Sequence, residues 1–341
     1  MKQDINNTPL VSVIVLTYNQ QNTVAQAIDS VLAQQCGFPY EIILADDGSG
    51  DQTPSVCREY AARFPDRIRL MLSERNRGLV ENYFEAVLHA RGKYIADCAG
   101  DDFWTATDRL RRQVDILEKE PDISIVHADW NYYDSATGAI TSPVPASGVF
   151  RYRQARMDGR QLLKAYMAAE EVPVPLIHLS TALYRKSIFD DEYGRNKDLF
   201  RNPAYRCEDV SVISTMLANG NVAFIRDKVL NYRVGHSSIS SGEDPAKTFD
   251  FYFSSLLMKL RLMDIYGVEE VKDSEAFRRN VHFLLSQAFL SRSKERMVLI
   301  TDTIKRHRLH YSLKGRVYSL IWKNDLLWRM GVNLMKSKRP S

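Results

Sequence analysis

Two acidic stretches hold the residue types in this sequence that could do chemistry. Asp101 and Asp102 are adjacent and follow an apolar stretch over residues 93–96. Because neighbouring carboxylates repel each other, something must compensate them, and a hard divalent cation shared with a substrate phosphate would do so. A solvated loop, or the cap of a helix starting near Thr107, would also account for the pair.

The second acidic stretch, residues 46–51, reads Asp-Asp-Gly-Ser-Gly-Asp. Asp, Gly and Ser are ordinary turn residues, which explains the stretch without function. The functional alternative is that one carboxylate accepts a hydrogen bond from a nucleobase N–H. Thr17, Tyr18 and Asn19 follow a third apolar stretch, and the Tyr18 ring could stack on a base or pack beneath its loop.

The elements that must position these residues alternate between strand and helix patterns. Short apolar runs predict strands, and apolar residues at helical spacing predict helices. The predicted strands are 11–16, 41–45, 67–72 and 93–96, and the predicted helices are 22–35, 52–63 and 79–90. Such a series predicts a Rossmann-like, doubly wound, mostly parallel α/β sheet whose ligands bind beyond the carboxyl ends of its strands. All three motifs follow such ends.

The rest of the chain is less regular and then helical. The patterns predict strands at 123–127, 130–133, near 180–184, 222–225 and 229–233, and a loop over 143–160. Helices are predicted at 209–218, 249–266, 274–290 and 293–307.

Composition and charge exclude several classes of protein. The 341 residues are 45% apolar and 26% charged, which is the balance of a globular protein rather than a disordered chain. The four cysteines have no C-x-x-C spacing, so we expect reduced thiols in a cytoplasmic protein. The polar N-terminus has no secretory signal pattern, and no stretch is apolar enough to predict a spanning helix.

The C-terminal tail is strongly basic. Residues 305–341 hold ten Lys and Arg against the single acidic Asp325, a net +9, which leaves −5 for the rest of the chain. A mildly acidic body does not predict nucleic-acid binding. The tail also has apolar residues at helical intervals, namely Leu313, Val317, Leu320, Ile321, Leu327 and Leu334. Two interpretations stay open: an amphipathic helix on an anionic membrane surface, or a helix packed on the catalytic domain.

Together these motifs resemble the family-2 glycosyltransferases, which have the GT-A fold. The matching segments are Val-Ser-Val-Ile-Val-Leu-Thr-Tyr-Asn at 11–19, Ser-Val-Leu-Ala-Gln at 30–34, the acidic turn at 46–51, Asn-Arg-Gly at 76–78 with Asn82, and Gly-Asp-Asp-Phe-Trp at 100–104. The last segment resembles a subgroup that reads Gly-Asp-Asp-(Tyr/Phe)-Trp. Many relatives have an acidic residue two places before the Asp pair, where this chain has Ala99.

The resemblance implies an inverting, metal-dependent glycosyltransferase of the hexosyltransferase type. The donor would be a nucleotide-diphosphate sugar, with UDP expected as the nucleotide. The acceptor would be a glycan or lipid-linked glycan of bacterial polysaccharide and cell-envelope assembly. The implied GT-A catalytic domain covers residues 1–240, with a nucleotide-binding half at about 9–130 and an acceptor half at about 131–240. Residues 241–341 would be a helical extension ending in the basic tail, and its docking would place the protein on the inner membrane face.

The resemblance also implies roles for individual residues. Asp209 is the expected base for the acceptor hydroxyl, with Glu208 as second choice. Asp102, Asp101 and His236 would hold Mn²⁺ or Mg²⁺, with Asp102 as the direct ligand. The expected nucleotide-binding residues are Thr17, Tyr18, Asn19, Asp46, Asp47, Arg75, Arg77 and Asp101.

Two other functions compete with this interpretation. A sugar nucleotidyltransferase also uses a doubly wound sheet, but it usually has a Gly-rich loop with Lys or Arg after the first strand. Residues 17–22 contain no Gly, Lys or Arg. A non-catalytic nucleotide-sugar-binding protein is supported only by Ala99. Release of nucleoside diphosphate, pyrophosphate exchange, or binding without turnover would separate the three.

Overall fold

The computed structural model describes residues 8–142, 154–168, 177–234 and 244–336, and every structural statement refers to these residues. They form two compact units. The first contains residues 8–163 and 177–234 within the described ranges, and the second contains 164–168 and 244–336. The domain boundary predicted near residue 240 lies outside the described residues.

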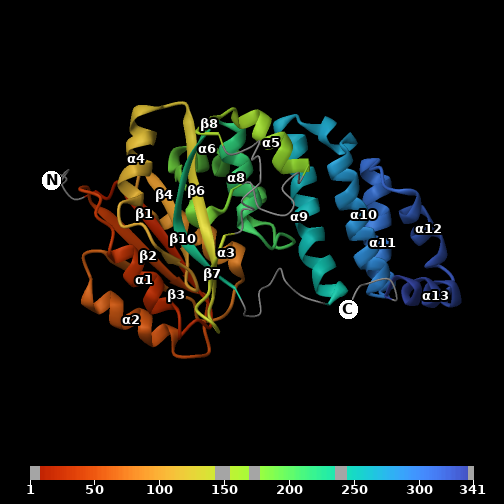
Figure 1. Cartoon of the computed structure of the whole chain (residues 1–341), viewed down its shortest axis with the longest axis horizontal. Helices are drawn as coiled ribbons and strands as arrows, with labels where there is room; N and C mark the ends of the chain where they lie inside the picture. Colours follow the sequence, from red (N-terminus) through yellow and green to blue (C-terminus); the bar gives the residue numbers. More distant parts are fainter. Residues whose placement is uncertain (1–7, 143–153, 169–176, 235–243, 337–341) are drawn as a thin grey trace. The chain divides into compact units, whose positions relative to one another are not determined.

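The first unit is built on one mixed sheet with strand order β3-β2-β1-β4-β9-β6-β10-β5. Its parallel half consists of β1 (Val11–Thr17), β2 (Tyr40–Asp46), β3 (Ile68–Leu72) and β4 (Tyr94–Ala99). Strands β1 and β2 are almost continuously apolar, and both faces of each are buried. The predicted doubly wound, mostly parallel α/β sheet is confirmed (Figure 1).

The other half of the sheet corrects the predicted strand boundaries. The pairs of strands predicted at 123–133 and at 222–233 are two continuous strands, β6 (Ile123–Asp134) and β10 (Asn221–Val234), which pair in parallel. Between Ile225 and Leu230 the pairing of β10 with β6 is irregular. In this polar stretch Asp227 forms an ion pair with Arg112. The shorter strands are β5 (Phe103–Trp104), β7 (Ile140–Thr141), β8 (Arg156–Met157) and β9 (Leu183–Arg185).

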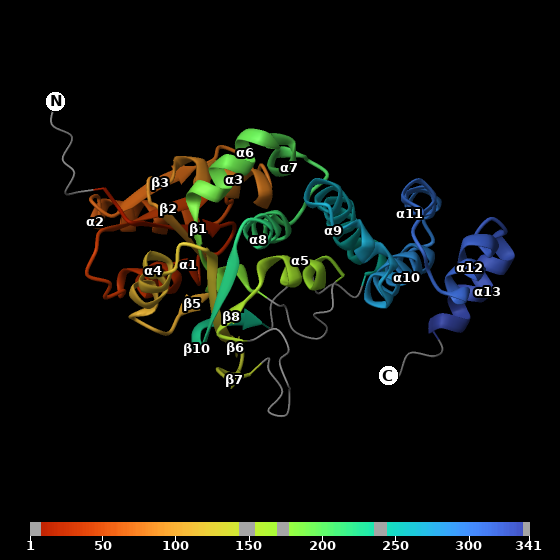
Figure 2. The same ribbon diagram turned by 90° about the horizontal axis from the view of Figure 1, so that it is seen from above.

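Helices cover both faces of this sheet (Figure 2). On one face lie α1 (Val24–Leu32), α2 (Thr53–Arg63) and α4 (Arg109–Lys119), whose apolar residues form one core with alternate residues of β1, β2 and β4. On the other face lie α3 (Leu79–His89) and α8 (Glu208–Ala218), with α6 (Lys186–Arg195) and α7 (Lys197–Arg201) packed against them. Helix α1 buries Val24, Ala27, Ile28 and Val31, the spacing of one helix face.

The sequence patterns did not predict α5, α6 or α7, and they gave α4 only as a helix that could start near Thr107. Helix α5 (Gly159–Ala168) begins inside the loop predicted over 143–160. A short 3₁₀ turn, η2 (Leu179–Thr181), lies where the strand at 180–184 was predicted to begin. Residues 143–153 of the predicted loop lie outside the described residues. All four cysteines are free thiols, as predicted.

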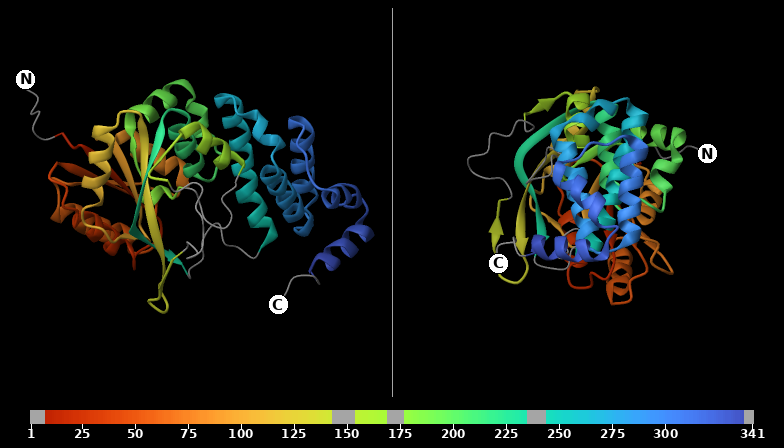
Figure 3. Two further views of the ribbon diagram at one scale, coloured as in Figure 1. Left: turned by 45° about the horizontal axis from the view of Figure 1, so that its top comes forward. Right: turned by 90° about the vertical axis from the view of Figure 1, so that its right-hand side faces the viewer.

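The second unit is helical, as predicted (Figure 3). It contains α9 (Pro245–Tyr266), the 3₁₀ segment η3 (Glu269–Asp273), α10 (Glu275–Leu290), α11 (Lys294–His307), α12 (Leu313–Ile321) and α13 (Asp325–Lys336). Side-chain oxygens of Asp244, Ser274, Ser293 and Ser312 cap the starts of α9 to α12. Among the described helices, none combines the length and apolarity needed to cross a bilayer.

Candidate active site

Three loops meet where β1, β2 and β3 end. Thr17 ends β1 in register with Asp46, which ends β2. The Asp47 amide donates to the Thr17 carbonyl at 3.0 Å, and the Ser73 amide donates to the Asp46 carbonyl at 2.9 Å. The motifs at 17–19 and 46–51 therefore share one edge of the sheet, as the strand pattern predicts.

Both carboxylates of the Asp46–Asp47 pair are buried and hydrogen-bonded. Asp46 accepts from the Ser49 amide at 3.0 Å. The two carboxylate oxygens of Asp47 accept from the amides of Arg77 and Gly78, each at 2.9 Å, just before α3 begins. Asp47 thus fixes the 76–78 loop against the second strand, and its place in base binding stays a prediction.

The backbone amides of the first loop donate to side chains of residues 49–53. The amide of Asn19 donates to Ser49 Oγ and that of Gln20 to Thr53 Oγ1, each at 2.8 Å, and that of Gln21 donates to Asp51 at 3.2 Å. The Tyr18 side chain is 47% exposed beside this network. An exposed ring on a fixed loop is suited to stacking on a base.

The two arginines predicted at the nucleotide differ in their surroundings. Arg75 is exposed. Arg77 is half-buried, with its Nε donating to Ser73 Oγ at 3.1 Å and its guanidinium 3.7 Å from the Glu81 carboxylate.

Gly48 has a φ of +70°, and a Cβ there would collide with the Arg75 backbone, so a side chain is excluded at this turn.

The acidic pair Asp101–Asp102 follows β4 and is fixed by Arg233 of β10. The Arg233 amide donates to Asp102 Oδ1 at 2.9 Å, and Arg233 Nε donates to the Asp101 carbonyl at 2.6 Å. Its guanidinium also donates to Ser135 and Gln26 and lies over the Phe103 and Tyr133 rings. Arg233 therefore fixes both the backbone and one carboxylate of the pair.

The second carboxylate oxygen of Asp102 is buried without a partner. Asp102 is 1% exposed, and its Oδ2 is buried with no hydrogen-bond partner among the described residues. Burial, followed by the charge of Asp101, raises the pKa of Asp102 well above its usual value, and Arg233 opposes the shift. A buried oxygen of this kind fits a cation, which would remove the cost of leaving it unpaired.

His236, the third expected metal ligand, lies outside the described residues, so its role stays a prediction. Ala99, at the position where many relatives have an acidic residue, supplies no ligand. Within the described ranges, no group of three or more His, Cys, Asp or Glu side chains is placed to hold a metal ion.

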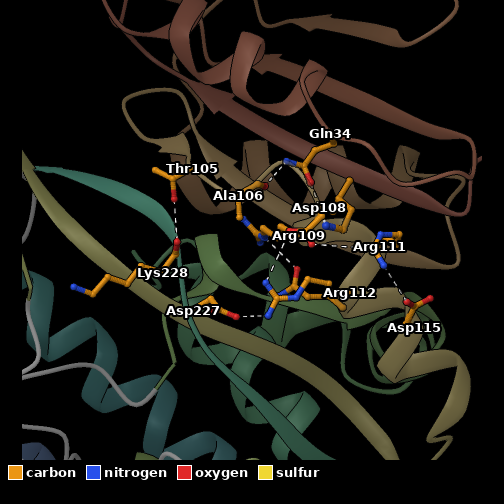
Figure 4. A network of polar contacts seen from close by, with 12 residues as sticks. Gln34, Thr105, Ala106, Asp108, Arg109, Arg111, Arg112, Asp115, Asp227 and Lys228 are labelled. Atoms are coloured by element: carbon orange, nitrogen blue, oxygen red, sulfur yellow. Dashed lines mark hydrogen bonds and ion pairs between the residues drawn. The ribbon is translucent and has the colours of Figure 1, made fainter.

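Helix α1 and the residues just after it hold the segment that follows the acidic pair. Ser30 Oγ accepts from the Trp104 amide at 3.0 Å. The Gln34 side chain donates to the Ala106 carbonyl at 2.7 Å and accepts from the Leu110 amide at 3.1 Å (Figure 4). The Ser-x-x-x-Gln spacing in the 30–34 motif therefore connects one helix to the segment that follows the acidic pair.

A buried arginine completes this support. Arg109 is 1% exposed, donates to the carbonyls of Ser180 and Ala182 at 2.7 and 2.9 Å, and lies over the Trp104 ring at 4.0 Å. Burial lowers its pKa to about 9, so it keeps its charge at neutral pH.

Glu208 and Asp209 form the first turn of α8 and are partly buried. Burial raises the pKa of Asp209 to about 6. Burial, then the neighbouring Asp209 charge, raises the pKa of Glu208 well above its usual value. A carboxyl group with a pKa near 6 is suited to accept a proton from a hydroxyl at neutral pH.

Tyr232 of β10 directly precedes Arg233, which holds the acidic pair. Burial raises the pKa of Tyr232 to about 12, and the charges of Asp102, Asp101 and Asp209 add to the effect. Helix α8, whose first turn contains Asp209, packs against β10, although Asp209 is more than 100 residues from the acidic pair in sequence.

One buried acid was not indicated by the sequence patterns. Asp97 is 6% exposed in the middle of β4, and neither of its carboxyl oxygens has a hydrogen-bond partner among the described residues. Burial raises its pKa well above the usual value; the Asp209 charge adds to the shift, and Arg109 opposes it. The signal was an acidic residue in an otherwise apolar strand.

A mixed sheet with acidic loops at the carboxyl ends of its parallel strands is the GT-A class of fold. The chain belongs to glycosyl transferase family 2, whose sequence model matches residues 12–192. That match includes the nucleotide-side loops and the acidic pair but ends before Glu208, Asp209 and Arg233.

Several known proteins are similar to this chain. Mb1547 of Mycobacterium bovis is 40% identical over 33% of this chain and 33% of its own length. EpsE of Bacillus subtilis is 37% identical over 42% and 52%. The succinoglycan biosynthesis protein ExoO of Rhizobium meliloti is 30% identical over 69% and 64%. The chain thus spans only about a third to two thirds of these relatives.

A solved structure supports the fold. TarS 1–349 of S. aureus in complex with UDP-GlcNAc has a TM-score of 0.53 and 14% sequence identity, and the match covers 92% of each chain. At this identity the likeness concerns the fold alone.

Proposed function

We propose that this protein is an inverting glycosyltransferase that moves a sugar from a nucleotide-diphosphate donor to a glycan or lipid-linked acceptor hydroxyl. The observation that carries the proposal is the buried Oδ2 of Asp102, which has no partner among the described residues and belongs to a pair held by Arg233 of β10. Helix α8, which begins with Glu208 and Asp209, packs against the same strand. A metal-diphosphate site and a base on neighbouring elements are what a single displacement at the anomeric carbon requires. Membership in family 2 supports the reaction class.

In this mechanism the loops at 17–19 and 46–51 bind the nucleotide, with Tyr18 stacked on the base. Arg75 is exposed and available to the diphosphate. Asp209 accepts the proton of the acceptor hydroxyl, whose oxygen attacks the anomeric carbon from the face opposite the departing nucleoside diphosphate. No enzyme nucleophile is needed, so the sugar is transferred with inversion.

Asp102 and Asp101 would hold the Mn²⁺ or Mg²⁺ ion. Such an ion supplies positive charge that neutralises the departing diphosphate. The buried, unpaired Oδ2 of Asp102 supports this assignment, and Arg233 orients the pair through its amide and guanidinium.

The hydrogen bonds of the first loop argue against a sugar nucleotidyltransferase. A phosphate-binding loop needs free backbone N–H groups. In this loop the amides of Asn19, Gln20 and Gln21 all donate to side chains of residues 49–53.

Turnover with a panel of donors tests the proposal. UDP-glucose, UDP-GlcNAc, UDP-galactose and GDP-mannose are each incubated with Mn²⁺, Mg²⁺ or EDTA, and release of the nucleoside diphosphate is measured. We expect metal-dependent release with at least one donor. Slow hydrolysis of the donor should show this release even when no acceptor is present. Pyrophosphate exchange would indicate a nucleotidyltransferase, and binding without release would indicate a non-catalytic protein. NMR of the glycoside product decides inversion.

A further inference from the structure

The two C-terminal helices have apolar residues on two sides. On the inner side, Trp328 and Val332 of α13 are 1% and 4% exposed. The Trp328 indole N–H donates to the Phe289 carbonyl of α10 at 2.8 Å, and the Tyr318 ring of α12 stacks on the Phe289 ring at 4.8 Å. This side accounts for the packing of both helices on α10.

The outer side has large apolar residues that contribute to no core of the described chain. On α12, Leu313, Val317 and Leu320 follow the i, i+4, i+7 spacing of one helix face and are 77%, 50% and 71% exposed. On α13, Leu326 and Met330 are one turn apart and are 67% and 61% exposed.

This outer apolar face does not serve the packing of α13. Each helical residue advances by about 100°, so Met330 lies about 200° from Trp328. Leu327 and Leu334 widen the exposed stripe on the same helix, at 46% and 60% exposure. A soluble helix needs one apolar stripe, and a second one marks an interaction surface.

Basic residues lie around these stripes. Lys314, Arg316, Lys323 and Arg329 are all exposed, and none forms an ion pair within the described residues. On α12, Lys314 and Arg316 flank the stripe of Leu313 and Leu320 at about 100° and 60° on its two sides. Asp325 is the only acidic residue between 305 and 341.

We propose that the outer faces of α12 and α13 bind an anionic lipid bilayer. Their leucines and Met330 would enter the headgroup–acyl boundary, and the four basic residues would contact the anionic headgroups. A second copy of the chain fits less well, because the centres of protein–protein interfaces are poor in lysine and two such surfaces would bring like charges together.

Liposome flotation of the full chain tests the proposal. Vesicles of phosphatidylcholine with about one third phosphatidylglycerol are compared with pure phosphatidylcholine at low and high salt. We expect flotation with the anionic vesicles at low salt and weaker flotation in the other conditions. The variant L320Q/L326Q/M330Q should bind about tenfold or more weakly. The control I140Q/V298Q/L299Q changes residues that are 58%, 45% and 44% exposed elsewhere and should float like the unmodified chain.

Folding of each variant is checked by circular dichroism, and K314Q/R316Q/K323Q/R329Q serves as a second test that leaves every apolar residue in place. This variant should lose the preference for anionic vesicles. The proposal is overturned if the unmodified chain does not float, if it floats equally with both lipids, or if the outer-face variant and the control float alike. A dimer in light scattering that only the outer-face variant loses, without flotation, would assign the surface to a second copy.

Discussion

At the scale of single residues, the candidate site uses carboxyl groups in different surroundings. Asp47 accepts two backbone amides, whereas Asp102 accepts one and keeps a buried oxygen without a partner. Asp209 has a pKa raised to about 6 by burial alone. Each surrounding suits a different task, namely fixing a loop, holding a cation and accepting a proton.

Asp209→Asn should lower kcat by about 100-fold or more while donor affinity is unchanged, because the amide cannot accept the acceptor's proton. Asp191→Asn, an exposed change on α6, is the control. In the unmodified enzyme, kcat/KM should fall as the pH drops through about 6, because Asp209, whose pKa is raised to about 6, becomes protonated there and can no longer act as the base. An unchanged kcat in Asp209→Asn would move the role to Glu208 or to no residue.

Asp102→Asn keeps an acceptor for the Arg233 amide but removes the charge that would hold the cation. Turnover should fall by about 100-fold or more. Calorimetry should show that Mn²⁺ no longer strengthens donor binding. Asp66→Asn, an exposed substitution, should behave like the unmodified chain. Normal metal-dependent turnover in Asp102→Asn would end its assignment as a ligand.

Asp97→Asn should make the free energy of unfolding less dependent on pH. The folded pKa of Asp97 is raised, so the folded state keeps a proton that the unfolded state releases above about pH 4. The contribution of this group to stability is therefore full at low pH and is lost as the pH rises, by at most about 1.4 kcal/mol per pH unit. Urea unfolding at several pH values measures the slope, and an identical slope in both proteins would contradict the account.

At the scale of elements, the acidic pair and the segment after it are held by parts of the chain that are far apart in sequence. Arg233 of β10 fixes the pair directly, while Ser30 of α1 and Gln34, which lies just past the end of α1, hold the following segment. A short stretch after a strand end thereby obtains a fixed geometry without a helix or long strand of its own.

Gln34→Ala should lower the free energy of unfolding by about 1–3 kcal/mol, because it leaves the Ala106 carbonyl and the Leu110 amide without partners. We also expect a higher KM for the donor, since the segment after the acidic pair is no longer held. Gln35→Ala changes an exposed side chain next to it and is the matched control. Equal stability and KM in the two variants would show that the contacts of Gln34 contribute nothing.

At the scale of the whole molecule, each compact unit has its own core. The first unit is organised around the sheet and the second around α10, against which Trp328 of α13 is packed. The nucleotide-side loops and the acidic pair belong entirely to the first unit.

Trp328→Ala should therefore destabilise the helical unit by about 3–5 kcal/mol, because it empties a fully buried site. Donor binding, which depends on the first unit, should be retained. Met330→Ala, on the exposed side of the same helix, should cost little. Calorimetric unfolding and donor titration together check this, and equal stability of the two variants would contradict the packing of α13.

The sequence by itself determined the local features of this protein. Continuous apolar runs predicted β1 and β2, helical spacing predicted α1, and the order of motifs identified the family, because these signals need only neighbouring residues. Only the tertiary structure showed that β6 and β10 are continuous, that Arg233 holds the acidic pair, that Gln34 holds the segment after it, and that Asp97 is buried. It also showed that α13 buries Trp328 and exposes Met330. Those facts depend on contacts between distant residues, which local spacing does not encode.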